Sequence, residues 1–228
     1  MMRRMTGWMA IGLLILGSAL MAQESVAVIV KMKGTVTVTP ANSQRSNDAR
    51  KGTVLRDGDR LETGAASFCA IKFLDDKSLL RLKENASCVI EGKRDGDAID
   101  KNIFVEVGAF FASLFQPRGE FKVTTPTSVA SVKGTQYWII QLGRSGPTRF
   151  VIDEGLVEVA NKIAKVLGKQ GQTIIVTSST TAPEVRLTRA GDIPVDEELG
   201  GSGQELEFEF ENDAGQTKTL RINLENED

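Results

Sequence analysis

The sequence predicts an all-β protein: a β-sandwich or β-roll of many short antiparallel strands with Gly-rich turns, followed by a C-terminal β-hairpin. Short runs in which apolar and polar residues alternate recur along the chain, the period-two pattern of half-buried strands. Turn signals built on the 22 glycines separate these runs at near-even spacing, which favours a sandwich, barrel or roll. The chain contains no convincing long amphipathic helix.

The chain up to residue 91 contains five segments with the strand pattern and two strong turn signals. Asp57-Gly58-Asp59 is a turn between apolar flanks, and Asp75-Asp76-Lys77 is a tight connection between two alternating runs. In the second of those runs, Leu80 and Leu82 are expected to point inward. The segments are Ala27–Lys33, Thr35–Thr39, Phe68–Leu74, Ser78–Leu82 and Asn85–Glu91, and Pro40–Lys51 is expected to be a surface loop.

The middle of the chain is less regular. Gly92–Asn102 is strongly charged and is expected to form a loop. Ile103–Leu114 is long enough for a short helix, but Val105 and Val107 favour strand and Gly108 interrupts the run. We therefore expect a strand, a turn at Gly108 and a second strand.

The fold is expected to be organised around Phe121–Leu142. Its first run alternates up to Pro126, which lacks the N–H group that a strand ladder needs. After Gly134, where the chain can turn sharply, Tyr137–Leu142 continues almost without a polar break. A run that is apolar on both faces predicts a strand covered on both sides, near the centre of the fold.

The remaining strands are expected around Gly-containing turns. Asp153-Glu154-Gly155 joins the two strands of a hairpin. The expected strands are Thr148–Ile152, Leu156–Ala160, Lys165–Leu167, Thr173–Thr177 and Glu184–Thr188. Together with the earlier segments they form one β domain over residues 27–190.

The C-terminal part differs in composition from the rest. Residues 191–203 form an acidic, Gly-rich linker. Residues 204–228 then predict an independent hairpin with one apolar and one charged face, which is marginal in water unless its apolar face is covered. Either the chain's own sheet covers that face, or the hairpin adds strands to a partner or to another copy. The candidate partner-binding residues are Leu206, Phe208, Phe210, Leu220, Ile222 and Leu224.

The N-terminus has the pattern of an export signal. Arg3 and Arg4 precede the apolar run Trp8–Leu20, which is shorter than the roughly 20 residues of a membrane span. We expect a signal peptide over residues 1–22 and a periplasmic or extracellular protein, with cleavage after Ala22 or after Ala27, or an uncleaved anchor, as the alternatives. No second apolar segment is long enough to cross a membrane, so no integral span is expected after cleavage.

The two cysteines are expected in the core. Cys69 shares a strand face with Ile71 and Phe73, and Cys88 shares one with Ile90. An exported protein can keep a disulfide between them, or both can stay as buried free thiols. The sequence leaves both alternatives open.

The composition argues against catalysis and against nucleic-acid binding. With 0 His, the chain has no Ser–His–Asp or Cys–His arrangement and no His-based zinc site. Without its first two arginines the chain carries 26 basic and 30 acidic groups, and it has no basic stripe interleaved with aromatic residues. We expect no catalytic residue, no cofactor, no metal site and no nucleic-acid partner.

An ordered set of short motifs resembles the FecR domain family. The set runs from Gly58–Gly64 and Ala70–Asp76 through Phe121–Pro126 and Val132–Thr135 to Asp153–Val159. Gly34-Thr35-Val36 and Gly171-Gln172 flank it, so the resemblance covers roughly residues 27–176. It implies an extracytoplasmic all-β module, and its turn glycines and Thr-Pro pair are expected to be structural.

The family's best-known members are transmembrane regulators that relay occupancy of an outer-membrane transporter to a sigma factor. Here only the signal peptide precedes the domain, without the cytoplasmic anti-sigma segment. The sequence therefore predicts a stand-alone, non-catalytic module for protein interaction or scaffolding in the bacterial cell envelope. Its partner is expected to be an envelope protein, with self-association through the hairpin as a further option. The alternatives are an accessory component of a cell-surface signalling relay and a module that binds cell wall or carbohydrate.

Overall fold

The structure is a computed structural model that describes residues 24–114, 117–194, 205–211 and 217–223, with backbone only for the last two ranges. Strands make up nearly all of its regular structure, and the only helix among the described residues is the short 3₁₀ turn η1 (Ala190–Asp192). No helix in the described part of the chain is long and apolar enough to span a membrane. The predicted signal peptide, residues 1–22, lies outside the described residues.

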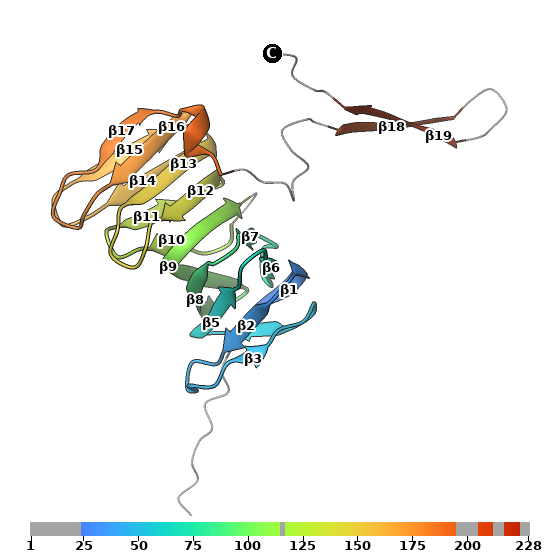
Figure 1. Ribbon diagram of the computed structural model, residues 1–228, viewed down its shortest axis with the longest axis horizontal. Helices are drawn as coiled ribbons and strands as arrows, with labels where there is room; N and C mark the ends of the chain where they lie inside the picture. The colour runs from blue at the N-terminus through green and yellow to red at the C-terminus, as the bar shows by residue number, and fades with distance from the viewer. Residues whose placement is uncertain (1–23, 115–116, 195–204, 212–216, 224–228) are drawn as a thin grey trace, which may run out of the picture.

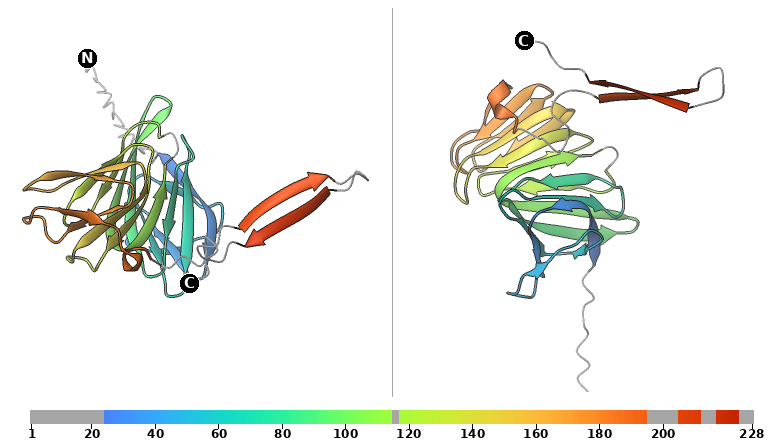
Figure 2. Two further views of the ribbon diagram at one scale, coloured as in Figure 1. Left: turned by 90° about the horizontal axis from the view of Figure 1, so that it is seen from above. Right: turned by 45° about the vertical axis from the view of Figure 1, so that its right-hand side comes forward.

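Two ladders of strands build the body of the molecule. Layer A pairs its strands in the order β4, β1, β6, β7, β9, β12, β13, β16 and β17, and layer B in the order β3, β2, β5, β8, β9, β10, β11, β14 and β15. Strand β9 belongs to both ladders, which therefore form one continuous 17-stranded sheet. The strands stack from β1–β5 at one end to β14–β17 at the other (Figures 1 and 2).

The strand bounds follow the turn signals of the sequence. They are β1 Ser25–Lys33, β2 Val36–Thr39, β3 Asn47–Asp48, β4 Val54–Arg56, β5 Asp59–Thr63, β6 Phe68–Phe73, β7 Leu79–Leu82, β8 Ser87–Asp95, β9 Ala98–Ser113, β10 Phe121–Thr124, β11 Val129–Val132, β12 Gln136–Gln141, β13 Thr148–Glu154, β14 Leu156–Ala160, β15 Lys165–Lys169, β16 Gln172–Val176, β17 Glu184–Leu187, β18 Glu205–Glu211 and β19 Thr217–Asn223.

The two layers face each other across one hydrophobic core. Phe73 of layer A and Phe121 of layer B meet edge to face, with ring centroids 5.6 Å apart. At the other end, a Cβ added to Gly168 of layer B would lie 2.9 Å from Ile152 Cδ1 and 2.7 Å from Ile174 Cδ1 of layer A. Because alternate residues of each strand point into the space between the layers, these residues form one continuous buried cluster. The all-β class predicted from the sequence is confirmed, but the strands are not all antiparallel, because β9 and β10 pair in parallel.

Strand β12 is covered on both faces, as its apolar run predicted. It lies between β9 and β13 in layer A. Tyr137 is fully buried in the inter-layer core, whereas Trp138 points to the other face and is only 2% exposed. There Trp138 packs against Phe111 with ring centroids 5.1 Å apart, in a second buried cluster with Ile140 and Val151.

Two expectations for the middle of the chain are wrong. The charged segment Gly92–Asn102 is not a loop, because β8 runs to Asp95 and β9 starts at Ala98, so only a tight turn separates the strands. Most of its charged side chains are exposed to solvent, whereas Lys101 is buried. Nor does a turn divide the run after it: β9 is one strand of 16 residues, and Gly108 (φ +110°) lies where it passes from layer B to layer A. Only glycine adopts this angle readily, so the strand bends there without ending.

Candidate functional site: a groove on the solvent face of layer B

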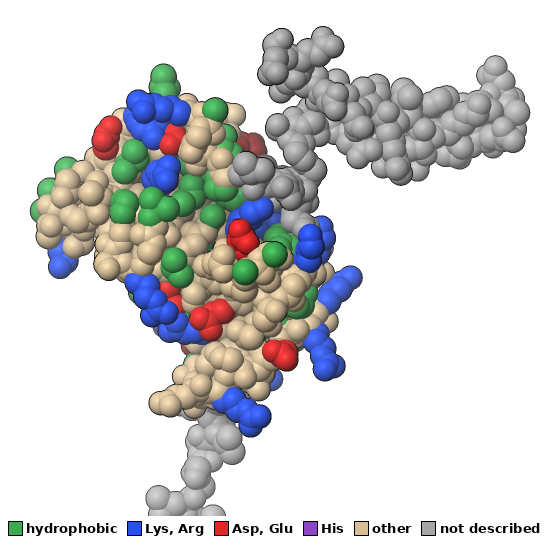
Figure 3. Space-filling view, in the orientation of Figure 1, with side chains coloured by type: hydrophobic (Ala, Val, Ile, Leu, Met, Phe, Trp, Pro, Cys, Tyr) green, Lys and Arg blue, Asp and Glu red, His purple; other side chains and the backbone are tan. Residues whose placement is uncertain are grey.

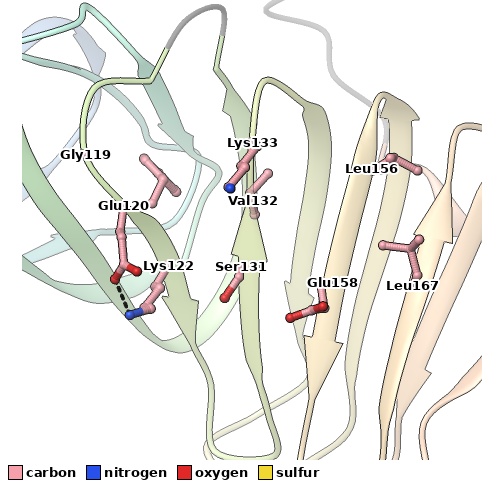
Figure 4. A pocket seen from close by; sticks show the side chains of 10 residues that line it. Gly119, Glu120, Lys122, Ser131, Val132, Lys133, Leu156, Glu158 and Leu167 are labelled. Carbon is pink, nitrogen blue, oxygen red and sulfur yellow. Dashed lines mark hydrogen bonds and ion pairs between the residues drawn. The ribbon is translucent and has the colours of Figure 1, made fainter.

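A groove of about 550 Å³ crosses the solvent face of layer B. The strands that form it, β10, β11, β14 and β15, are hydrogen-bonded neighbours. Cross-strand register places Lys122, Ser131, Glu158 and Leu167 in one row across these strands, and Figure 4 shows their side chains along the groove. Alternate residues of the same strands, such as Phe121, point into the core. Because side chains alternate between the two faces of a strand, the outward-pointing residues of these strands line the groove.

The apolar part of the groove lies at its β14–β15 end. Leu156 is 48% exposed and Leu167 is 51% exposed. Val129, on the neighbouring strand β11, is 38% exposed. Hydrophobic side chains gather on this face over β11, β14 and β15, with lysine and arginine around them (Figure 3). Clustered leucines rimmed by charge are typical of surfaces that bind other proteins.

The charged groups of the groove are paired and solvated. Lys122 forms an ion pair with Glu120, and the hydrogen bond from this pair raises the pKa of Lys122. Glu158 accepts from Lys165 at 2.9 Å, in a pair that is exposed on both sides. Exposed pairs of this kind contribute little to stability, at most about 1 kcal/mol. They give the groove a mixed charge pattern.

A second hollow of about 370 Å³ continues the groove across β8 and β9. It shares Glu120 and Lys122 with the first and adds further charged residues such as Asp57 and Lys93. Together the two hollows span the solvent face of layer B from β8 to β15. An extended surface with many shallow contacts suits a protein segment better than an enclosed small molecule.

The groove offers binding groups and no recognisable reaction centre. Ser131 is its one hydroxyl group, and its neighbours in the row are Lys122 and Glu158. Activation of a serine needs an adjacent base held by a third group, and in the described part of the chain no hydrogen bond joins Ser131 to such a base.

The structure places the two cysteines on facing layers as free thiols. Cys69 lies on β6 of layer A and Cys88 on β8 of layer B, and both are fully buried. Burial raises the pKa of Cys69 to about 12. The pKa of Cys88 is also raised, mainly by burial and to a smaller extent by the nearby Cys69. Both side chains are therefore protonated and act as small apolar core groups. The disulfide, one of the two alternatives that the sequence left open, stays untested.

The predicted C-terminal hairpin is present as a two-stranded sheet of β18 and β19. Its register sets Leu206 opposite Ile222 and Phe208 opposite Leu220, so these four positions share one face by strand geometry. Phe210 lies opposite Lys218, and Leu224 falls outside the described residues. Residues 195–203 of the predicted linker are outside them too. Asp192, at the start of that predicted linker, is buried at the end of the β body.

The Thr-Pro segment that carries part of the family resemblance has a structural role. Thr127 Oγ1 lies 2.6 Å from Thr148 Oγ1, which also donates to Gln141 Oε1 at 2.5 Å. Thr125 joins the same buried network through its hydroxyl group, 3.1 Å from that of Thr148. The network ties the β10–β11 turn of layer B to the β12–β13 hairpin of layer A.

The Gly-Thr pair before β12 also has a structural role. Thr135 Oγ1 donates to the carbonyl oxygen of Leu156 at 2.9 Å. Gly155 has φ +84°, and a Cβ there would lie 2.8 Å from the carbonyl oxygen of Gly134. The β11–β12 and β13–β14 turns are therefore packed so closely that only glycine fits, as the family resemblance implied.

A buried ionic cluster lies behind the Asp75-Asp76 turn, and sequence reasoning missed it. Lys101 Nζ donates to Asp75 Oδ2 at 2.7 Å and to Asp76 Oδ2 at 2.8 Å, and all three side chains are at most 1% exposed. Burial alone would raise the pKa of Asp76, but the hydrogen bonds from Lys101 and from the Ser78 and Arg118 backbone lower it. The sequence does contain a signal for this cluster. Lys101 lies at an inward position of an alternating strand, and a buried lysine requires a buried partner.

Comparison with known proteins identifies one family and one set of structures. Residues 59–158 match the family model described as FecR protein. Two crystal structures of a proposed anti-sigma factor from Parabacteroides distasonis ATCC 8503 are similar, with TM-scores of 0.49 and 0.48 at 14% and 16% identity. Each match covers 57% of this chain and 60% of the other. A search of curated protein sequences finds no match.

Proposed function

We propose that this chain, whose residues 59–158 belong to the FecR family, is an exported, non-catalytic module that binds a protein partner in the bacterial cell envelope. The family match supports a signalling-related role in the broad sense. The groove on the solvent face of layer B is the partner-binding surface. The partner is a protein with an extended, mixed-charge segment that carries apolar side chains.

The observation that carries this proposal is the partly apolar, exposed lining of the groove on layer B. Several residues that carry the family resemblance, such as Asp76, Thr135 and Gly155, make internal contacts. On the solvent face of layer B, by contrast, Leu156 and Leu167 are about half exposed beside lysines and glutamates. A module of this kind presents a rigid surface, and its side-chain chemistry serves recognition.

Export rests on the N-terminal residues. The two arginines followed by the apolar run Trp8–Leu20 fit a secretory signal. Fractionation of producing cells, with N-terminal sequencing of the recovered protein, tests this part. A new N-terminus near Gln23 or Val28 in the periplasmic or extracellular fraction is expected, and an intact Met1 in the cytoplasm would contradict it.

A second candidate function is an accessory component of a cell-surface signalling relay. The FecR match favours it over a purely structural scaffold. In that case, deletion of the gene changes the transcription of a sigma-factor regulon under inducing conditions. A deletion strain whose transcription profile is unchanged under envelope stress and nutrient limitation would exclude the relay.

Binding of cell wall or carbohydrate receives less support. Sugar-binding surfaces usually present aromatic rings for stacking, but Tyr137 and Trp138 are buried, and so is every Phe of the described body except Phe104, which is half-buried. Pull-down on isolated cell-wall material tests this alternative directly. Retention of the wild-type chain there, unaffected by changes in the groove, would favour it over protein binding.

The proposed surface is tested by co-purification from envelope extract. The wild-type chain is compared with a Lys122→Glu/Lys133→Glu variant, which reverses two charges in the groove. We expect a defined partner to be lost from the variant, because reversed charges oppose the complementary field of the partner.

The matched control is Lys51→Glu/Lys72→Glu, which makes the same net charge change at exposed positions away from the groove. It should retain the partner. Equal recovery of the partner by the groove variant and the control would contradict the assignment of this surface.

A further inference from the structure

The body of the molecule has an open end, formed by β15 in layer B and β17 in layer A. In the described residues β15 pairs only with β14, and β17 pairs only with β16. The inward-facing Val166 and Val185 are only partly buried there, and Leu187 is 74% exposed. Open strand edges with exposed apolar side chains are sites where further strands add.

Charge is distributed unevenly along the chain. Residues 24–194 contain 24 Lys and Arg against 19 Asp and Glu, for a net charge of +5. Residues 195–228 contain 2 against 11, for a net charge of −9. The acidic C-terminal segment is therefore complementary to the basic body that it follows.

The residue pattern of the hairpin matches the edge strand β15. On β15, Lys165 and Lys169 point to solvent, whereas Val166 and the buried Gly168 face the core. On β18, Glu205, Glu207, Glu209 and Glu211 alternate with Leu206, Phe208 and Phe210. A β18 strand beside β15 would place its glutamates next to the lysines and its apolar residues towards the core. Lys165 already forms such a cross-strand pair with Glu158 of β14, at 2.9 Å.

The chain leaves the body close to this open end. Asp192 holds the last turn against β17 through two bonds of 2.6 Å from Arg186. Ten residues, 195–204, then lead to β18, and they can span up to roughly 33 Å. Facing sheets in a sandwich are about 10 Å apart, so the connection is long enough to bring the hairpin to β15 of the same molecule.

We propose that the C-terminal hairpin, β18 and β19, docks in cis on the β15 edge of layer B and closes the open end of the sandwich. Its glutamates face Lys165 and Lys169, and its apolar positions cover Val166, Val185 and Leu187. The docked hairpin extends the layer that carries the groove, beside Leu167. This inference does not depend on the proposed function, because it concerns contacts within one chain.

Hydrogen–deuterium exchange of the full chain tests the docking. In the wild type we expect slow exchange for the β15 amides that do not bond to β14. The Lys165→Glu/Lys169→Glu variant should exchange at those amides about tenfold faster or more, because like charges then face each other. The charge-swapped variant, which adds Glu207→Lys and Glu209→Lys, should recover the protection. A Phe208→Asp variant should lose the protection of the β15 amides, as the Lys165→Glu/Lys169→Glu variant does.

Two controls separate this docking from other arrangements. Lys51→Glu/Lys72→Glu makes the same charge change elsewhere on the body and should leave β15 exchange unchanged. Light scattering over a range of concentrations should report a monomer. Fast β15 exchange in the wild type, or no effect of the charge reversal, would overturn the proposal. Protection that appears only with dimer formation would also overturn it, because the occupant would then be the hairpin of a second copy.

Discussion

Lys101 shows how one buried side chain holds the chain together. It donates to both aspartates of the β6–β7 turn and also to the carbonyl oxygens of Ile99 and Arg118, at 2.9 and 3.0 Å. Asp75 Oδ2 in turn accepts from the Ile99 N–H group. One ammonium group thus links the β6–β7 turn, strand β9 and the segment leading into β10.

Removing this ammonium group should be strongly destabilising. A Lys101→Met change leaves two buried carboxylates without their cation, and breaking a buried pair in this way costs about 3–5 kcal/mol. Urea unfolding followed by circular dichroism measures the loss. The exposed Lys93→Met, on the neighbouring strand β8, should change the free energy of unfolding by less than about 0.5 kcal/mol. Equal stability of the two variants would contradict a supporting role for Lys101.

Two aspartates should make the protein sensitive to acid. Hydrogen bonds from Arg186 lower the pKa of Asp192 well below its usual range, and those from Lys101 and nearby backbone lower that of Asp76. Because the folded pKa values lie below the unfolded value of about 3.9, both groups stabilise the fold fully above about pH 4. That contribution is lost as the pH falls through the folded values.

The Asp192→Asn variant tests this linkage by thermal unfolding between pH 7 and pH 2. Its melting temperature should lie below that of the wild type at pH 7, and the two curves should converge as the pH falls. Asp97→Asn, at an exposed turn, serves as the control and should follow the wild type throughout. A constant difference between Asp192→Asn and the wild type down to pH 2 would contradict the pKa shift.

At the scale of single elements, tight turns determine how the strands are joined. Gly155 and Gly52 both have a positive φ, +84° and +89°, but their surroundings differ. A Cβ at position 155 would meet the Gly134 carbonyl oxygen and the Thr135 side chain, whereas position 52 has nothing within 4 Å. A side chain at position 52 would therefore cause backbone strain alone, whereas one at position 155 would cause backbone strain and a steric clash.

Alanine at these two positions should have unequal effects. Gly52→Ala introduces only the backbone strain, which costs about 1–2 kcal/mol. Gly155→Ala adds an overpacking cost of about 1–3 kcal/mol. Chemical denaturation of both variants measures the difference, and equal losses would show that the β11–β12 and β13–β14 turns can relax.

The sequence predicted the elements that have a strong local signal. The Asp57-Gly58 turn and the β6–β7 hairpin are where their turn residues placed them. Asp153-Glu154-Gly155 does form a turn, but the hairpin expected there is wrong, because β13 pairs within layer A and β14 pairs within layer B. The β8–β9 hairpin was missed, because the charge of Gly92–Asn102 suggested a loop, although one face of these strands is open to solvent. The bend at Gly108 could not be distinguished from a turn, because it depends on the long-range pairing of β9 with both layers.

At the scale of the whole molecule, the solvent face of layer B is the least predictable feature. The outward position of Lys122, Ser131, Glu158 and Leu167 follows from strand alternation, but their alignment in one row depends on the register between four strands. The sequence identified the two ends of the chain as special, and it gave no sign that the middle of the body carries a groove. Register is set by the packed fold, so the groove could be found only in the structure.

The proposed function depends most on whether this groove binds a partner protein. The most direct measurement is site-specific photo-crosslinking in intact cells, with the crosslinking residue at position 131 in the groove or, as a control, at position 72 on the outer face of layer A. We predict a discrete envelope-protein adduct from position 131 and none from position 72. The same adducts from both positions, or no adduct from position 131, would contradict the binding of a partner protein in the groove.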